Sequence, residues 1–344
     1  MGARTHARQF GMRPSGIWLP ECGYYPGLEG LLEEAGYGYF FVDAHGLLNA
    51  TPRPYYGLSA PVVCPNGVAA FGRDLESSRR VWSREEGYPG DFQYRDFYRD
   101  VGFDLDFDYV RPFILDGRTR IHTGFKYYRI TGPGDHKLPY DPAEAARRVM
   151  AHADDFVARS RRNVAGQGAR STPAPLIVSP YDAELFGHWW FEGPEWLESL
   201  LRRLPAAKGK LVAVTPGEYL AEQPVQQIAQ PCFSSWGNKG YAEVWLDGSN
   251  DWLYRYLHEQ AGRMTDLLRR FPAERGIRRR TLNQAFREML LSEASDWAFI
   301  MKTGTTVPYA VRRAKEHISN FTRLCDSVIA NSTAWRAAGA DTPC

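Results

Sequence analysis

Three carboxylates come after apolar, strand-like runs of the chain. Glu21 ends the segment IWLPE, Asp43 ends YFFVD, and Asp182 lies four residues beyond the run LIV. In α/β barrels the residues at the carboxyl ends of parallel strands face a common mouth, where active sites form. Two carboxyl groups on separate strand ends are the minimum apparatus for breaking a glycosidic bond. We therefore expect an acid–base site at one edge of an α/β fold.

The elements that would position these carboxylates alternate between short apolar runs and helical stretches. Apolar runs at 17–19, 39–42, 79–83, 176–178 and 211–214 are predicted to be strands. Helical spacing predicts helices over 27–35, 141–162, 195–204 and 216–221. Asp141 followed by Pro142 is typical of a helix start. This alternation predicts a parallel α/β sheet or barrel.

The predicted secondary structure changes near residue 250, from alternating strands and helices to helices alone. Segments 251–271, 281–292 and 307–329 have helical periodicity with no strand-like run between them. The stretch 223–250 is rich in Pro, Gly, Ser and aromatic residues, which is typical of a boundary. We therefore expect a catalytic domain over 1–225 and a helical domain over 226–344.

Composition and charge exclude several classes of protein. The 344 residues carry 42 Lys and Arg against 40 Asp and Glu, a net charge of +2. This balance argues against a nucleic-acid or membrane-surface protein. No run approaches the roughly 18 apolar residues of a membrane helix, and the first dozen residues lack an apolar stretch. Five scattered cysteines show no zinc-like spacing, so we expect a cytoplasmic protein without metal or cofactor.

The motifs GIWLPECGY (16–24) and SPYDAELFGHWW (179–190) resemble the two catalytic motifs of glycoside hydrolase family 57. The resemblance is closest to the 1,4-α-glucan branching enzymes of that family. It continues, in family order, through FVDAH, VWS, GYPG, PYDP, SWG, VWLD and EASDW. It implies a (β/α)7 barrel followed by an all-helical C-terminal domain, with an α-glucan as substrate.

The resemblance also implies roles for the two catalytic carboxylates. Glu21 would be the nucleophile of a retaining transglycosylase and Asp182 its general acid/base. Transfer to a 6-hydroxyl of another glucan chain would create an α-1,6 branch, as in glycogen, whereas transfer to water would be hydrolysis.

Further residues would bind the glucan. Tyr56 lies in a Pro-rich loop that resembles a mobile lid over the site, with Tyr55 as an equally available neighbour. By the same resemblance, Trp82, Trp236 and Trp245 would line a glucan groove, where indole faces stack on sugar rings. Asp296 belongs to the last family motif, and His45 would line the site.

One family element is missing from the printed sequence. The His-x-Pro motif of the opening barrel strand does not occur in it, so the resemblance covers about the C-terminal two-thirds of a family member. We expect an incomplete barrel that a missing N-terminal segment or a partner chain completes, and weak or no activity of this chain alone.

Three alternatives stay open. A family 57 4-α-glucanotransferase or an α-amylase-type hydrolase would use the same carboxylates with a different acceptor. A non-catalytic glucan-binding remnant would keep the tryptophans and lose the chemistry.

Overall fold

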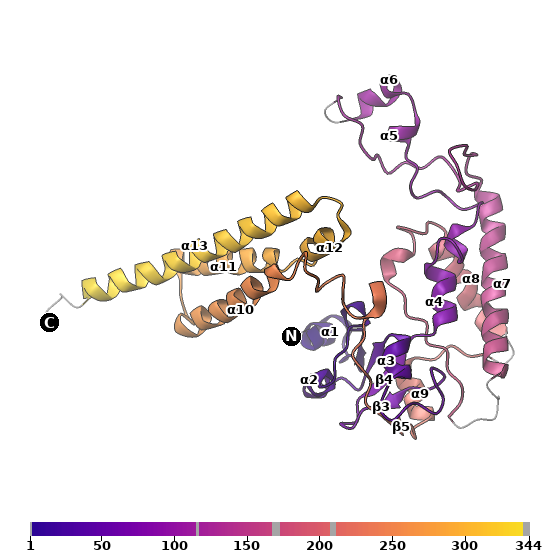
Figure 1. The fold of residues 1–344 in the computed structure, drawn as a ribbon, viewed down its shortest axis with the longest axis horizontal. Helices are drawn as coiled ribbons and strands as arrows, with labels where there is room; N and C mark the ends of the chain where they lie inside the picture. The colour runs from indigo at the N-terminus through magenta and orange to yellow at the C-terminus, as the bar shows by residue number, and fades with distance from the viewer. Residues whose placement is uncertain (1, 115–116, 167–172, 207–210, 340–344) are drawn as a thin grey trace. The chain divides into compact units, whose positions relative to one another are not determined.

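The computed structural model describes residues 2–114, 117–166, 173–206 and 211–339. The chain divides into two compact units, Met1–Ser235 and Trp236–Cys344, and each is described by itself (Figure 1). The first unit mixes a sheet with helices, and the second is helical.

A five-stranded sheet organises the first unit. Its order is β1-β2-β4-β3-β5. β2 is parallel to β1, with Gly16 opposite Tyr39, and to β4, with Tyr39 opposite Ala69, whereas β3 is antiparallel to β4. The five strands are β1 (Gly16–Ile17), β2 (Tyr39–Val42), β3 (Val62–Val63), β4 (Ala69–Gly72) and β5 (Gln227–Ile228). The predicted α/β character is confirmed, although the sheet is mixed and not wholly parallel.

Alternate side chains of the sheet pack against different layers, as the two-residue period of a strand requires. Phe40 and Val42 share a buried cluster with Leu32 of α2 (Leu28–Glu34) and Leu47 of α3 (Ala44–Leu48). On the alternate positions, Phe41 and Phe71 pack with Val178 and with Tyr219 of α9 (Pro216–Glu222). These two layers hold the carboxyl ends of β1, β2 and β4 in place.

A second core lies among three longer helices (Figure 1). It buries Val81 of α4 (Leu75–Trp82), Val149 and Ala153 of α7 (Pro142–Gly166), and Trp196 of α8 (Gly193–Ala206). The predicted helix start at Asp141 is confirmed, because its Oδ1 accepts from the N–H groups of Ala143 at 2.9 Å and Glu144 at 3.3 Å. The predicted helices near 27–35, 195–204 and 216–221 are confirmed as α2, α8 and α9.

Three strand predictions are wrong. Segment 79–83 lies at the end of α4, which begins at the N-cap Asp74. Segment 176–178 lies between Pro175 and Pro180, and its backbone makes isolated hydrogen bonds in place of a strand ladder. The Leu176 N–H donates to the Ser59 carbonyl, and the Val178 carbonyl accepts from the Asp74 N–H. Prolines lack the N–H that a ladder needs. Segment 211–214 is also irregular, because a capping box at Thr215 turns the chain into α9.

Short elements connect these parts. A long connection of short helices and loops joins β4 to α7, and Asp100 stabilises it. The Asp100 carboxylate is fully buried and accepts from the backbone N–H groups of Gly102, Thr123 and Gly124. The short elements of the unit are α1 (Gly2–Phe10), η1 (Pro20–Cys22), η2 (Tyr88–Gly90), α5 (Val101–Asp104), α6 (Phe107–Val110), η3 (Arg111–Phe113) and η4 (Ala183–Leu185).

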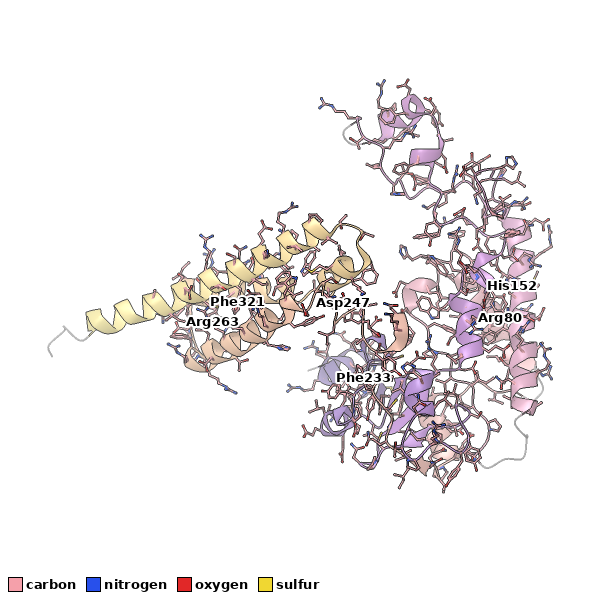
Figure 2. All side chains as sticks on the ribbon, viewed as in Figure 1. Arg80, His152, Phe233, Asp247, Arg263 and Phe321 are labelled. Carbon is pink, nitrogen blue, oxygen red and sulfur yellow. The ribbon has the colours of Figure 1, made fainter. Side chains whose placement is uncertain are left out.

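The second unit is built from four helices and one short turn. They are η5 (Asn238–Gly240), α10 (Trp252–Arg270), α11 (Gly276–Ser292), α12 (Asp296–Thr303) and α13 (Val307–Gly339). The core joins Met264, Leu282 and Phe321, the last of which is labelled in Figure 2. The three predicted helices are confirmed, and α12 was not predicted. In the described parts of the chain, no helix is both long and apolar enough to cross a membrane.

Candidate active site

The loop after β1 presents Glu21 in an unusual backbone conformation. Glu21 has φ 59° and ψ 20°, and Cys22 has φ 47°. Left-handed backbone costs a residue with a side chain roughly 1–2 kcal/mol. The buried side chains of Leu19 and Cys22 anchor the turn on both sides, and Gly23 donates to the Pro20 carbonyl at 2.8 Å. The half-buried Glu21 side chain is therefore held by a packed, strained turn.

Asp182 lies just before η4, on a segment tied to α4. The Tyr181 hydroxyl donates to the Ser77 carbonyl at 3.1 Å, and the Ser179 and Ser77 hydroxyls are 2.8 Å apart. Burial, the largest cause, and the charges of Glu184 and Glu21 together raise the pKa of Asp182 to about 6. Glu21 and Asp182 thus lie within electrostatic reach of each other, and Asp182 holds a proton in mildly acidic solution.

Asp43 and Arg73 form a buried ion pair on the neighbouring strand ends. Asp43 directly follows β2, and Arg73 directly follows β4. The Arg73 Nε and Nη2 donate to the two Asp43 oxygens at 3.0 and 3.1 Å. Asp43 also caps α3 by accepting from the Ala44 N–H at 2.6 Å. His45 Nδ1 lies 3.7 Å from Asp43 Oδ2, so three charged or titratable groups meet here.

The buried thiol of Cys22 links these groups electrostatically. Burial raises the pKa of Cys22 to about 12; Arg73 lowers it, whereas Asp43 and Asp182 raise it. All three groups therefore act on one atom next to Glu21. A thiol with this pKa stays protonated near neutral pH and is a poor nucleophile.

Sequence reasoning missed Arg73. Its strand, AAFG, is short and built from small residues apart from one Phe, so it carried no strong strand signal. An Arg placed directly after such a run, beside a strand-end acid, was the available clue.

The expected sugar-binding residues of the first unit occupy different environments. Tyr56 is 44% exposed and its neighbour Tyr55 is 85% exposed, on the loop between α3 and β3. Trp82, at the last position of α4, packs against the core of α4, α7 and α8. His45 joins the Asp43–Arg73 pair.

The remaining three expected residues belong to the second unit. Trp236 and Trp245 are half-buried, and Trp245 lies 5.9 Å from the Phe299 ring. Asp296 is exposed in the first turn of α12, which is a favourable position for an acidic side chain.

No metal centre is apparent in the described residues, where no group of three or more His, Cys, Asp or Glu side chains is placed to hold an ion. The site brings together two carboxyl groups and an adjacent ion pair.

Comparison with known proteins accords with this site. The sequence model of glycosyl hydrolase family 57 matches residues 1–231, and that of the 1,4-alpha-glucan branching enzyme C-terminal region matches residues 256–340. A 1,4-alpha-glucan branching enzyme of Thermococcus kodakarensis is 32% identical over 95% of this chain and 50% of its own length. The chain spans about half the length of the curated relatives it matches.

Two solved structures are similar over nearly the whole chain. The alpha-amylase AmyC from Thermotoga maritima is 42% identical, with a TM-score of 0.83 over 96% of this chain and 62% of its own. A family 57 branching enzyme from Pyrococcus horikoshii is 32% identical, with a TM-score of 0.80 over 95% of this chain and 60% of its own. A family model that covers residues 1–231, together with these structures, shows that the chain belongs to glycosyl hydrolase family 57.

Proposed function

We propose that this chain carries the catalytic carboxylates of a 1,4-α-glucan branching enzyme, a retaining transglycosylase that forms α-1,6 branches. The observation that carries the proposal is the raised pKa of Asp182 within electrostatic reach of Glu21. Environments that make one of two neighbouring carboxyls the acid are how such sites divide the work. The names of the relatives and the match over residues 256–340 support branching as the outcome.

In the first half of the proposed reaction, the Glu21 carboxylate attacks the anomeric carbon of an α-1,4-linked glucosyl unit. Asp182 gives its proton to the departing glycosidic oxygen, and a covalent glycosyl–Glu21 ester forms. In the second half Asp182, now a base, takes the proton of an acceptor 6-hydroxyl as that oxygen attacks the same carbon. Two inversions retain the α configuration, and Asp182 ends protonated.

The buried Asp43–Arg73 pair supports this chemistry by position. Asp43 follows β2, the neighbour of β1, and Arg73 follows β4, the next strand of the sheet. The Arg73 guanidinium acts electrostatically on Cys22, in the turn that carries Glu21. The pair therefore acts as a positioning group and not as a reacting one.

The sheet and helices of the first unit are proposed to be part of a (β/α)7 barrel, with residues 1–225 as its catalytic portion and 226–344 as the helical domain. The parallel neighbours β1, β2 and β4, with chemistry at their carboxyl ends, support this assignment. A further polypeptide segment or partner completing the barrel stays a proposal, as does a cytoplasmic location.

The α-glucan would be held by aromatic and polar side chains. We assign this role to Tyr56, on its exposed loop, and to His45 beside Asp43. Family resemblance supports the same role for Trp82, Trp236, Trp245 and Asp296. Trp82 is also partly buried against the helical core.

The proposal is tested with amylose as substrate. Because the chain alone is expected to have weak or no activity, any α-1,6 linkages that it creates should be few; they are detected by isoamylase debranching followed by chain-length analysis, and Glu21→Gln and Asp182→Asn should each abolish them. An activated fluoroglucosyl donor should label Glu21 covalently, which mass spectrometry of the 16–24 peptide reads independently of overall turnover. Labelling at another carboxylate would overturn the assignment.

A second candidate is an α-amylase-type hydrolase, favoured by the similarity to AmyC. The carboxylates would have the same roles, with water as acceptor. Reducing-end release without new α-1,6 linkages would select this reading over branching.

A further inference from the structure

A groove on the first unit lies between α7 and the segment that follows α4. Its volume is about 410 Å³, within the roughly 300–1,000 Å³ range of small-molecule sites. None of the residues around Glu21 and Asp182 lines it. The side chains that shape it are Asp91, Phe92, Gln93, Glu144, Arg148 and His152.

One wall is a polar stripe on α7. Glu144, Arg148 and His152 are spaced by four residues, which places them on one face of the helix. Figure 2 labels His152 on α7. This face is therefore a row of a carboxylate, a guanidinium and an imidazole.

The polar groups of the groove are held in fixed positions. Arg148 Nε and Nη2 donate to Asp91 Oδ2 at 2.8 and 2.6 Å, and His152 Nε2 lies 3.5 Å from the same oxygen. The Tyr94 hydroxyl and His152 Nδ1 are 2.8 Å apart. The Gln93 N–H donates to Asp91 Oδ1 at 2.9 Å. Groups fixed before a ligand arrives lose little freedom on binding.

Phe92 supplies an apolar surface beside these groups. Its side chain is 56% exposed, although it follows the buried Tyr88 and Pro89 closely in the chain. Exposed aromatic faces next to planar hydrogen-bonding side chains suit ligands with both C–H faces and hydroxyl groups. Sugars combine these two features.

The charged side chains that line the groove are paired, and Arg129 adjoins them by donating to Gln93 Oε1. Arg148 is neutralised by Asp91, Arg147 pairs with Glu144, and burial lowers the pKa of His152 to about 4, so that its ring is neutral near pH 7. A phosphate or sulfate would find no uncompensated cation among the side chains that line the groove. A neutral polyhydroxylated ligand would find donors and acceptors of both kinds.

We propose that this groove is a second binding site for a short segment of neutral α-1,4-glucan, separate from the catalytic carboxylates. One glucosyl ring stacks on Phe92 while its hydroxyls bond to Arg148, Asp91 and Gln93. The inference rests on the proposed function for its choice of sugar. A site of this kind holds a long glucan chain on the protein while another part of the chain reacts.

The test uses the Glu21→Gln protein, which does not consume the probe, with maltohexaose. Hydrogen exchange measured by mass spectrometry should show protection of peptides covering 87–93 and 144–152. Phe92→Ala in that background should raise the maltohexaose concentration needed for this protection roughly three- to tenfold. Phe92→Trp should leave that concentration unchanged. Phe113→Ala, which removes another exposed ring of the same unit, is the matched control and should change nothing.

Peptides 16–24 and 179–186 report on the proposed catalytic site, and peptides 87–93 and 144–152 report on the groove. Protection of 16–24 and 179–186 without protection of 87–93 would overturn the second site and leave the proposed function standing. Protection at the groove that survives Phe92→Ala would overturn the stacking role. Protection at the groove alone would contradict the proposed catalytic site, and protection nowhere would contradict both.

Discussion

Removing the positive charge of Arg73 is the sharpest test of how the active-site edge is built. Arg73→Met keeps the length and the apolar stem of the side chain and deletes the guanidinium. Asp43, 6% exposed, then loses its two charge-assisted bonds of 3.0 and 3.1 Å and keeps only the Ala44 N–H and the distant His45 ring.

The expected cost is large because the remaining charge is buried. Breaking a buried pair from one side typically costs about 3–5 kcal/mol, a substantial share of the roughly 5–15 kcal/mol that stabilises a domain. The matched control is Arg147→Met, which breaks the exposed Glu144–Arg147 pair, with side chains 42% and 60% exposed. Exposed pairs contribute about 0–1 kcal/mol.

The assay is urea denaturation followed by tryptophan fluorescence, with the free energy of unfolding taken from the midpoint at unchanged slope. Adding Asp43→Asn to Arg73→Met should recover part of the loss, since the uncompensated charge is then gone. A loss for Arg73→Met no larger than that for Arg147→Met would refute the reasoning that this pair organises the strand ends.

Four other predictions concern the titration of Asp182, the loop that carries Tyr56 and the turn at Gly90. The rate of the first half-reaction should fall about tenfold per pH unit above pH 6, because Asp182 with its pKa of about 6 loses the proton that the leaving group needs. Glu184→Gln should move this limb of the pH–rate profile to lower pH. A limb that does not move would contradict the effect of the Glu184 charge on Asp182. The same raised pKa means that the folded chain binds this proton more tightly than the unfolded chain, so the contribution of Asp182 to stability is present below pH 3.8 and lost as the pH rises to about 6. Tyr56→Ala should raise the ratio of reducing-end release to α-1,6 linkages severalfold, because an exposed loop residue that shields the intermediate is lost; an unchanged ratio would remove Tyr56 from the lid. Gly90→Ala should lower stability by about 3 kcal/mol or more, since its Cβ would lie 1.6 Å from the Arg84 carbonyl oxygen, and a thermal midpoint equal to that of the unchanged chain would contradict the packing of that turn.

The fold was predictable where local signals were strong. Asp141-Pro142 marked the start of α7 correctly, and the strand at 39–42 carries aromatic and β-branched residues that agree with their position. Segment 176–178 failed because its apolar composition is that of a strand while flanking prolines remove ladder donors. Tertiary packing, not hydrogen-bond pattern, explains those apolar residues.

The two candidate carboxylates could be named from the sequence, whereas the groups that surround them could not. Glu21 and Asp182 stand out as acids after apolar runs, and the structure gives Asp182 a pKa perturbed by Glu21. The position of Arg73 beside Asp43 depends on the strand order β1-β2-β4. This order brings segments that are distant in the chain together, and no local sequence pattern predicts it. The left-handed backbone at Glu21 is equally invisible in sequence, because non-glycine residues rarely adopt it.

The left-handed backbone at Glu21 and Cys22 also has a consequence for the stability of the chain. Two successive residues with side chains, Glu21 and Cys22, stand where glycine would relieve the turn. Mutation continually offers such relief, and a protein that had abandoned chemistry would drift toward it, since nothing opposes a stabilising replacement at an idle position. A carboxylate held at an energetic disadvantage is what the proposed catalytic role of Glu21 would require, and the strained turn therefore favours that proposal over a sugar-binding relic.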